Sequence, residues 1–134
     1  MKVIVDTCIW SLALRRGSSS RSPIVVELES LIKDFKVQMI GPIRQEILSG
    51  IRSQSQFKNL KKRLGSFQDL PILTKDFEKA AEFYNLCMSK GIQGSNTDFL
   101  ICAVATRNKF SLYTTDKDFQ LFSKHIPIKL HAFK

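Results

Sequence analysis

Four acidic residues stand at places in the chain where carboxylates can do chemistry. They are Asp6, Glu46, Asp98 and Asp116. The first and the last come just after short apolar runs, and the third begins a long apolar stretch. Carboxylates that share one pocket repel one another unless a cation joins them. Since oxygen ligands favour Mg²⁺ or Mn²⁺ over zinc, these residues are candidate ligands of a divalent metal ion.

Glu46 stands out from its surroundings. It is the single acid between residues 35 and 68, a window that holds seven basic residues. On a helical wheel it lies at the edge of an apolar stripe, and Gly50, one turn further on, leaves room for a close approach. A solvated helix side chain is the alternative interpretation of this residue.

Ordinary structural roles are open to the other three acids as well. Asp6 and Asp98 can each cap a helix, and Asp116 can close an Asx turn. The metal site and the capping roles therefore remain competing interpretations of the same residues.

The overall charge of the chain favours a polyanionic partner. Its 134 residues hold 21 Lys and Arg against 12 Asp and Glu, which gives a formal net charge of +9. Nucleic acid is the common polyanion, although a basic protein that is merely soluble has the same balance. Carboxylate-bound metal ions activate water and stabilise the leaving oxygen in phosphodiester hydrolysis. Acids for the metal, with basic flanks for the substrate backbone, predict a nuclease.

One short basic segment is a candidate for contacts with RNA phosphates. Residues 54–64 predict a helix whose inner face is Phe57, Leu60 and Leu64. Its outer face carries four basic residues, Lys58, Lys61, Lys62 and Arg63. Protein docking or dimerisation is the alternative use of this face.

Strands that alternate with helices position the acids. Strands are expected at residues 3–5, 36–40, 71–73, 111–114 and 128–130. This order predicts an α/β fold with a mainly parallel sheet of about five strands and helices on both faces. Ligands of such sheets bind beyond the carboxyl ends of the strands. Asp6, Glu46 and Asp116 fall at that rim, whereas Asp98 joins them only if its helix begins there.

Caps and apolar periodicity mark the expected helices. They lie at residues 8–14, from Pro23 after a Ser22 cap, from Pro42, at 54–64, from a Thr74 cap to Gly91, from Asp98, and through 119–122. The longest of them has an expected inner face of Phe77, Ala80, Ala81, Tyr84, Cys87 and Met88. A polar loop is expected at residues 15–21.

Length and composition bound the class of protein. Residues 1–134 fit one domain of ordinary size. No uncharged stretch approaches the roughly 20 residues of a membrane-spanning helix, and no signal peptide is recognised. Three cysteines, Cys8, Cys87 and Cys102, lack CxxC spacing and indicate reduced thiols of a cytoplasmic protein.

Four segments resemble the motifs of PIN-domain ribonucleases, most of all the VapC toxins of toxin–antitoxin pairs. Residues 3–7 match the opening strand with its first acid, and residues 46–50 match the E-(I/L)-x-x-G segment. Residues 98–103 match the D-x-L-I-A-A helix with a cysteine in place of one alanine, and residues 114–119 match the T-x-D-x-x-F segment. The motifs keep the family's order and span nearly the whole chain.

The resemblance implies a PIN-like, Rossmann-like domain that acts as a Mg²⁺-dependent endoribonuclease, with Mn²⁺ as the other candidate ion. It implies that the four acids are the catalytic, metal-binding residues. Thr114 matches the family's hydroxyl position beside them, and Asp118 is a further carboxylate near the site. A homodimer is also implied, as is an antitoxin whose extended tail covers the cleft.

Two functions from other classes compete with that of a toxin ribonuclease. One is a non-catalytic nucleic-acid-binding module with structural acids, which Mg²⁺ would not stabilise. The other is a signalling receiver domain, which needs a phospho-accepting Asp after a middle strand and a Lys late in the chain. The equivalent region here supplies Glu46 on a helix, which argues against a receiver.

Overall fold

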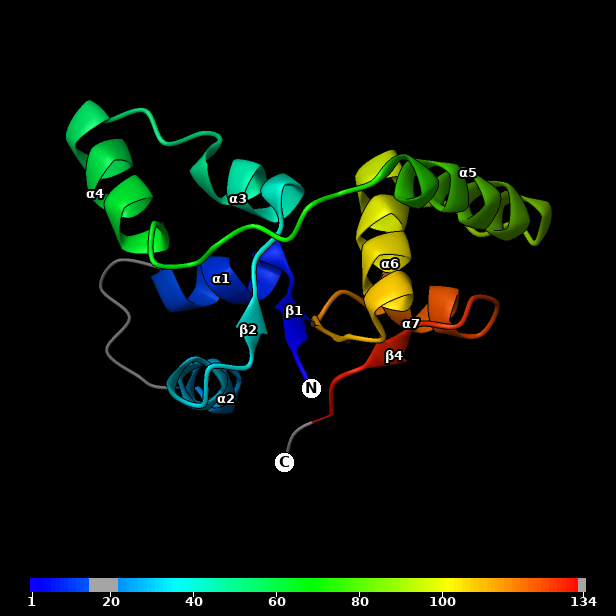
Figure 1. Cartoon of the computed structure of the whole chain (residues 1–134), viewed down its shortest axis with the longest axis horizontal. Coiled ribbons are helices and arrows are strands. Elements are labelled where there is room, and N and C mark those ends of the chain that lie inside the picture. Colours follow the sequence, from blue (N-terminus) through cyan, green and yellow to red (C-terminus); the bar gives the residue numbers. More distant parts are fainter. Residues whose placement is uncertain (15–21, 133–134) are drawn as a thin grey trace.

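A parallel sheet forms the centre of the protein. The structure is a computed structural model that describes residues 1–14 and 22–132, so the polar loop expected at 15–21 lies outside the described residues. The strands are β1 (Val3–Val5), β2 (Val37–Gln38), β3 (Ser111–Tyr113) and β4 (Lys129–Leu130), in the sheet order β2-β1-β3-β4 (Figure 1). The expected α/β class with a parallel sheet is confirmed, with four strands in the described part of the chain.

Seven helices accompany the sheet in the described residues. They are α1 (Thr7–Leu14), α2 (Pro23–Lys33), α3 (Gly41–Leu48), α4 (Gln54–Leu64), α5 (Thr74–Ser89), α6 (Asn96–Asn108) and α7 (Lys117–Ser123). In Figure 1, α1 to α4 lie on one side of β1 and α5 to α7 lie on the other. None of the helices in the described residues is long and apolar enough to cross a membrane.

Helix α6 carries a large share of the core because its apolar residues are buried around most of its circumference. Phe99 and every residue of the run 101–105 are buried. The helix begins at Asn96, two residues before the expected start, because the Ser95 side chain accepts a hydrogen bond from Asp98 N at 3.0 Å and so caps it. Asp98 is consequently the third residue of α6, at the helix end that faces the sheet rim.

The expected strand at residues 71–73 is not formed. Pro71 has no N–H to donate, and its carbonyl accepts a hydrogen bond from Arg107 Nη2 at 3.2 Å. The main-chain N–H of Leu73 donates to Asp76 Oδ2 at 2.9 Å. Side chains of α5 and α6 thus satisfy backbone groups that a strand would have paired. The strand expected at 36–40 is correspondingly short, and Met39 pairs with Asp69 in an isolated parallel bridge.

Helix α5 departs from its expected inner face. Ala80 and Cys87 are buried as expected, but Phe77, Ala81 and Met88 are exposed. Asp76 and Phe83, which were not expected inside, are buried as well. Leu73, not Thr74, is the residue that precedes the helix, because the Asp76 carboxylate holds the Leu73 N–H. The expected stop at Gly91 is confirmed: its φ is +76°, and its N–H donates to Met88 O at 3.0 Å.

Two other expectations from helix patterning are confirmed. Ser22 caps α2 by accepting a hydrogen bond from Val25 N at 3.3 Å. Helix α4 spans residues 54–64 as expected, with Leu64 buried and its basic residues exposed. The three cysteines, all of which lie in the described part, are free thiols.

Candidate active site

Asp6 is fixed at the carboxyl end of the central strand. Its N–H donates to Tyr113 O at 2.9 Å and so continues the pairing of β1 with β3. Its carboxylate accepts hydrogen bonds from Thr7 N at 2.8 Å and from Thr114 Oγ1 at 2.8 Å. Cys8 Sγ also lies 3.6 Å from Oδ2. The side chain is only 8% exposed, so its carboxylate is held in one position by donors from two elements.

Glu46 reaches the same rim from α3. Ile43 and Ile47 turn the buried face of this helix to the core, which leaves Glu46 exposed at its edge. Its Oε1 accepts a hydrogen bond from Thr7 Oγ1 at 3.1 Å. A cavity of about 410 Å³ opens here, lined by Thr7, Pro42, Gln45, Glu46, Ser49 and Thr97.

Asp98 and Asp116 both have the structural roles that the sequence left open, a helix cap for Asp98 and an Asx turn for Asp116. Asp98 Oδ2 accepts a hydrogen bond from Ser95 N at 3.2 Å, which makes it one half of a capping box. Asp116 Oδ1 caps α7 by accepting from Asp118 N at 2.9 Å. Each role uses one carboxylate oxygen. Within the described residues the other oxygen of each side chain has no hydrogen-bond partner, so capping leaves it free to bind a ligand.

Three of the acids influence one another electrostatically. Burial raises the pKa of Asp98, and the negative charges of Asp6 and Asp116 raise it further, against hydrogen bonds from Ser95 that lower it. Thr114 joins two of these acids, since its Oγ1 donates to Asp6 Oδ2 and accepts from Asp116 N at 3.0 Å. Among the described residues no Lys or Arg forms an ion pair with any of the four acids.

The side chains do not form a ready chelate. No group of three or more His, Cys, Asp and Glu side chains in residues 1–14 and 22–132 is close enough to hold a metal ion. Thr7 therefore links Asp6 to Glu46, and Thr114 links Asp6 to the main chain of Asp116. Asp98 interacts with Asp6 and Asp116 through charge alone, and the four acids are not at ligating distances.

Among the residues expected beside the acids, Thr114 makes the contacts expected of a supporting hydroxyl. Asp118 is exposed and contributes its main-chain N–H to Asp116. Thr7 and Cys8 both contact Asp6, although neither was predicted as a site residue. Their position directly after a strand-end acid is the signal that could have identified them.

The basic residues of α4 lie beside a separate groove. This groove, of about 600 Å³, runs between α1, α3 and α4, and Arg63 lines it together with apolar residues such as Leu14, Ile47 and Leu60. Lys58, Lys61 and Lys62 are exposed on the same helix. Helix α3 therefore contributes to both places: its Glu46 belongs to the group of acids, and its Ile47 lines the groove beside the basic helix.

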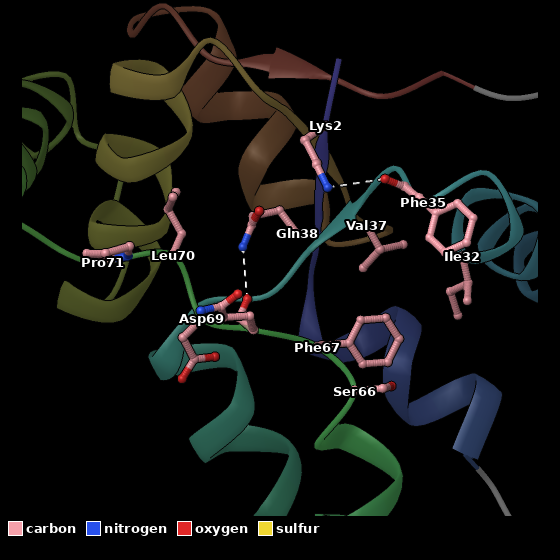
Figure 2. Close-up of a pocket in the computed structure, with 11 residues that line it drawn as sticks. Lys2, Ile32, Phe35, Val37, Gln38, Ser66, Phe67, Asp69, Leu70 and Pro71 are labelled. Carbon is pink, nitrogen blue, oxygen red and sulfur yellow. Dashed lines mark hydrogen bonds between the residues drawn. The ribbon is translucent and has the colours of Figure 1, made fainter.

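A third cavity lies at the free edge of β2 and contains none of the four acids. It measures about 580 Å³ and is lined by residues of α2, β2 and the segment before α5 (Figure 2). Lys2 Nζ donates to Phe35 O at 3.2 Å across its mouth, and Gln38 Nε2 donates to Gln68 O at 3.0 Å (Figure 2). Its one acid, Asp69, pairs with Arg44. The four acids without a Lys or Arg partner in the described residues lie near the carboxyl ends of the strands. The candidate active site is therefore there and not in this cavity.

The comparisons with known proteins agree with this architecture. Residues 3–124 match the PIN domain family, and the chain belongs to that family. PIN domains are generally nucleases. No curated protein sequence matches the chain significantly.

Several solved structures share the fold. FitAcB from Neisseria gonorrhoeae aligns with a TM-score of 0.77 at 18% identity, over 97% of this chain and 96% of that one. VapBC2 from Rickettsia felis, bound to a DNA fragment from its promoter, aligns with a TM-score of 0.78 at 20% identity, over 100% of both chains. FitAB bound to the IR36 DNA fragment aligns with a TM-score of 0.76 at 19% identity, over 96% of this chain and 93% of that one. At these identities the likeness shows the fold.

Proposed function

We propose that this protein is a Mg²⁺-dependent endoribonuclease, with Mn²⁺ as the alternative ion, and that it is the toxin of a type II toxin–antitoxin pair. The observation that carries the proposal is the group of Asp6, Asp98 and Asp116 at the carboxyl end of β1 and β3. Burial raises the pKa of Asp98, and the charges of Asp6 and Asp116 raise it further. None of the three carboxylates pairs with a Lys or Arg in the described residues. A divalent cation is the partner that such a group lacks.

The residues present fit that ion in the chemistry of their donors. All four acids offer carboxylate oxygens, and the hydroxyls of Thr7 and Thr114 already bind two of them. Asp6, Glu46, Asp98 and Asp116 would hold the ion, after side-chain adjustments that bring them to ligating distance. When bound, the ion supplies an activated water for attack on a phosphodiester.

The chain itself provides orientation and substrate grip. Thr114 Oγ1 and the Thr7 N–H each donate to one oxygen of Asp6, which holds this carboxylate in one orientation. We propose that Lys58, Lys61, Lys62 and Arg63 bind the RNA backbone. Exposed basic residues on one helix suit phosphates, whose recognition depends on charge rather than sequence.

The partners follow from the same family. We propose an antitoxin whose extended tail covers the acidic cleft, supported by neighbours of the same fold that are complexes bound to DNA.

We also propose a homodimer. The exposed Phe77 and Met88 of α5 support it, because large apolar side chains in solvent are typical of surfaces that a partner covers.

A non-catalytic nucleic-acid-binding module is the second candidate. It is favoured by the capping bonds of Asp98 and Asp116, which give both acids a structural use, and by the lack of a preformed metal cluster in the described residues. In that case the basic residues would bind nucleic acid and the acids would do nothing beyond capping.

Cleavage of RNA by purified protein separates the two candidates. We expect the wild-type chain to cut RNA in Mg²⁺ and to stop in EDTA, and Asp6→Asn to be inactive in both. Asp34→Asn is the matched control, since it removes the same charge from an exposed residue at the end of α2. Cleavage by Asp6→Asn at the wild-type rate would refute the catalytic role.

Mapping the cut ends across total cellular RNA after induced expression identifies the substrate.

A further inference from the structure

Thr7 links two acids that come from different parts of the chain. Its main-chain N–H donates to Asp6 Oδ1 at 2.8 Å, and its Oγ1 donates to Glu46 Oε1 at 3.1 Å. Asp6 follows β1, whereas Glu46 lies on α3, and Thr7 lines the cavity that Glu46 also lines. One residue therefore binds both carboxylates at once.

Glu46 needs such a restraint more than the other acids do. Asp98 and Asp116 are held by main-chain donors of their own helices, and Asp6 is buried. Glu46 is exposed, and its longer side chain has more rotamers to lose on binding a ligand. In the described part of the chain, the Thr7 hydroxyl is its one hydrogen-bond donor.

Threonine is well suited to this task. Its β-branched side chain has few χ1 rotamers in a helix, so its hydroxyl is held in a defined direction at the start of α1. The bond occupies Oε1 of Glu46 and leaves Oε2 available.

The fold does not itself require the hydroxyl. The first turn of α1 is closed by Ile9 N and Trp10 N, which donate to Asp6 O at 3.0 and 3.3 Å. The Thr7 hydroxyl takes no part in that turn and is directed at Glu46 instead. A helix can begin equally well with a residue that lacks it.

We infer that Thr7 is a positioning residue for the metal site, which fixes the Glu46 carboxylate beside Asp6 so that both face one cation. The inference rests on the proposed function, because it presumes that these acids bind a divalent ion. Thr7 acts through Glu46 and touches neither the ion nor the substrate.

Three variants test this role by direct titration with Mn²⁺, followed by calorimetry, together with melting in EDTA. Thr7→Val keeps the shape and the main-chain N–H but removes the hydroxyl. Thr7→Ser restores a hydroxyl. Thr97→Val is the matched control, since Thr97 lines the same cavity and its hydroxyl has no hydrogen bond in the described residues.

We expect Thr7→Val to bind Mn²⁺ about tenfold more weakly than the wild type, the usual cost of losing a supporting contact to a ligand, while melting at the wild-type temperature in EDTA. Thr7→Ser should regain most of the affinity, and Thr97→Val should match the wild type. In a Glu46→Gln background, Thr7→Val should cause no further loss, because its effect passes through that carboxylate.

Three results would overturn the inference, and they are distinguishable. If the wild type binds Mn²⁺ and Thr7→Val binds it equally well, Thr7 has no positioning role and the proposed function stands. If the wild-type chain binds no Mn²⁺, the proposed metal site fails and the inference fails with it. An equal loss of affinity in Thr7→Ser and Thr7→Val would also contradict a role for the hydroxyl.

Discussion

Asp76 and Asp98 occupy the same position in two neighbouring helices, with opposite surroundings. Each is the third residue of its helix, and each accepts a hydrogen bond from the main-chain N–H three residues earlier, Leu73 N at 2.9 Å and Ser95 N at 3.2 Å. Asp76 is 1% exposed and forms two bonds with Arg107, at 2.6 and 2.9 Å. Asp98 faces the charges of Asp6 and Asp116 instead.

The pKa shifts of the two carboxyls therefore differ in direction. Burial alone would raise the pKa of Asp76, but hydrogen bonds from Arg107 and Leu73 and the positive charges of Arg107 and Lys75 hold it below its usual range. Burial and its acidic neighbours raise the pKa of Asp98. The two residues have the same capping role, so capping does not explain the difference. The structural acid Asp76 therefore forms an ion pair with Arg107. Asp98 instead has two other carboxylates, Asp6 and Asp116, as its charged neighbours.

Breaking the structural pair gives the largest expected change in stability. Arg107→Ala leaves the Asp76 carboxylate buried without its cation, which should lower the free energy of unfolding by about 3 kcal/mol. Urea denaturation measures it. Lys79→Ala, which breaks the exposed pair with Glu82, is the control and should cost less than about 1 kcal/mol. The Mg²⁺ response of Arg107→Ala should equal that of the wild type; a lost response would contradict the separation of the two regions.

The same pair predicts how stability depends on pH. The pKa of Asp76 is lower in the folded chain than its ordinary value of 3.8, so the unfolded chain binds the proton more readily. The stabilisation is therefore fully present above pH 3.8 and is lost as the pH falls through the lower, folded-state pKa. Denaturation of the wild type and Asp76→Asn across this acid range should show the loss in the wild type alone. Parallel curves for the two proteins would contradict this assignment.

The basic helix should give the smallest of these effects. Replacing Lys61 and Lys62 by Ala should weaken RNA binding and flatten its salt dependence by about 0.7 in log–log slope for each lost phosphate contact. Lys90 and Lys124, exposed lysines outside α4, provide the matched double control. An unchanged slope would assign this face to antitoxin docking or dimerisation instead.

The sequence predicted the elements where local chemistry decides them. Ser22 with Pro23, and Gly91 with its positive φ, mark helix ends whose signals need no knowledge of the fold. The inner face of α5 was predicted only in part: Ala80 and Cys87 are buried as expected, whereas Phe77 is exposed. Asp76, which apolar periodicity does not include, is buried and pairs with Arg107. Residues 71–73 were wrongly predicted to form a strand for a similar reason. Side chains of α5 and α6 hydrogen-bond to their backbone, and the local sequence does not reveal those contacts.

For the candidate site, the sequence predicted the acids and the Thr114 hydroxyl beside them, but not the contacts that Thr7 makes. The strand ends predicted that Asp6, Glu46 and Asp116 share one rim, with Asp98 joining them if its helix begins there, and motif order predicted the same four acids as site residues. The Thr7 hydroxyl that joins α1 to α3 depends on how these helices pack, which no local pattern encodes. The approach of Asp98 to Asp6 likewise depends on where α6 begins, and Ser95 sets that position.

Thermal unfolding of Asp6→Asn, with and without Mg²⁺, tests the metal-site account most directly. A cation bound only to the folded chain stabilises it by RT ln(1 + [L]/Kd), about 2.7 kcal/mol at a hundredfold excess over Kd. The account predicts that the wild type and Asp34→Asn gain that stabilisation. It predicts that Asp6→Asn is at least as stable as the wild type in EDTA, because one repelling charge is gone, and that Mg²⁺ scarcely stabilises it. An Asp6→Asn variant that Mg²⁺ stabilises as much as the wild type would contradict the account.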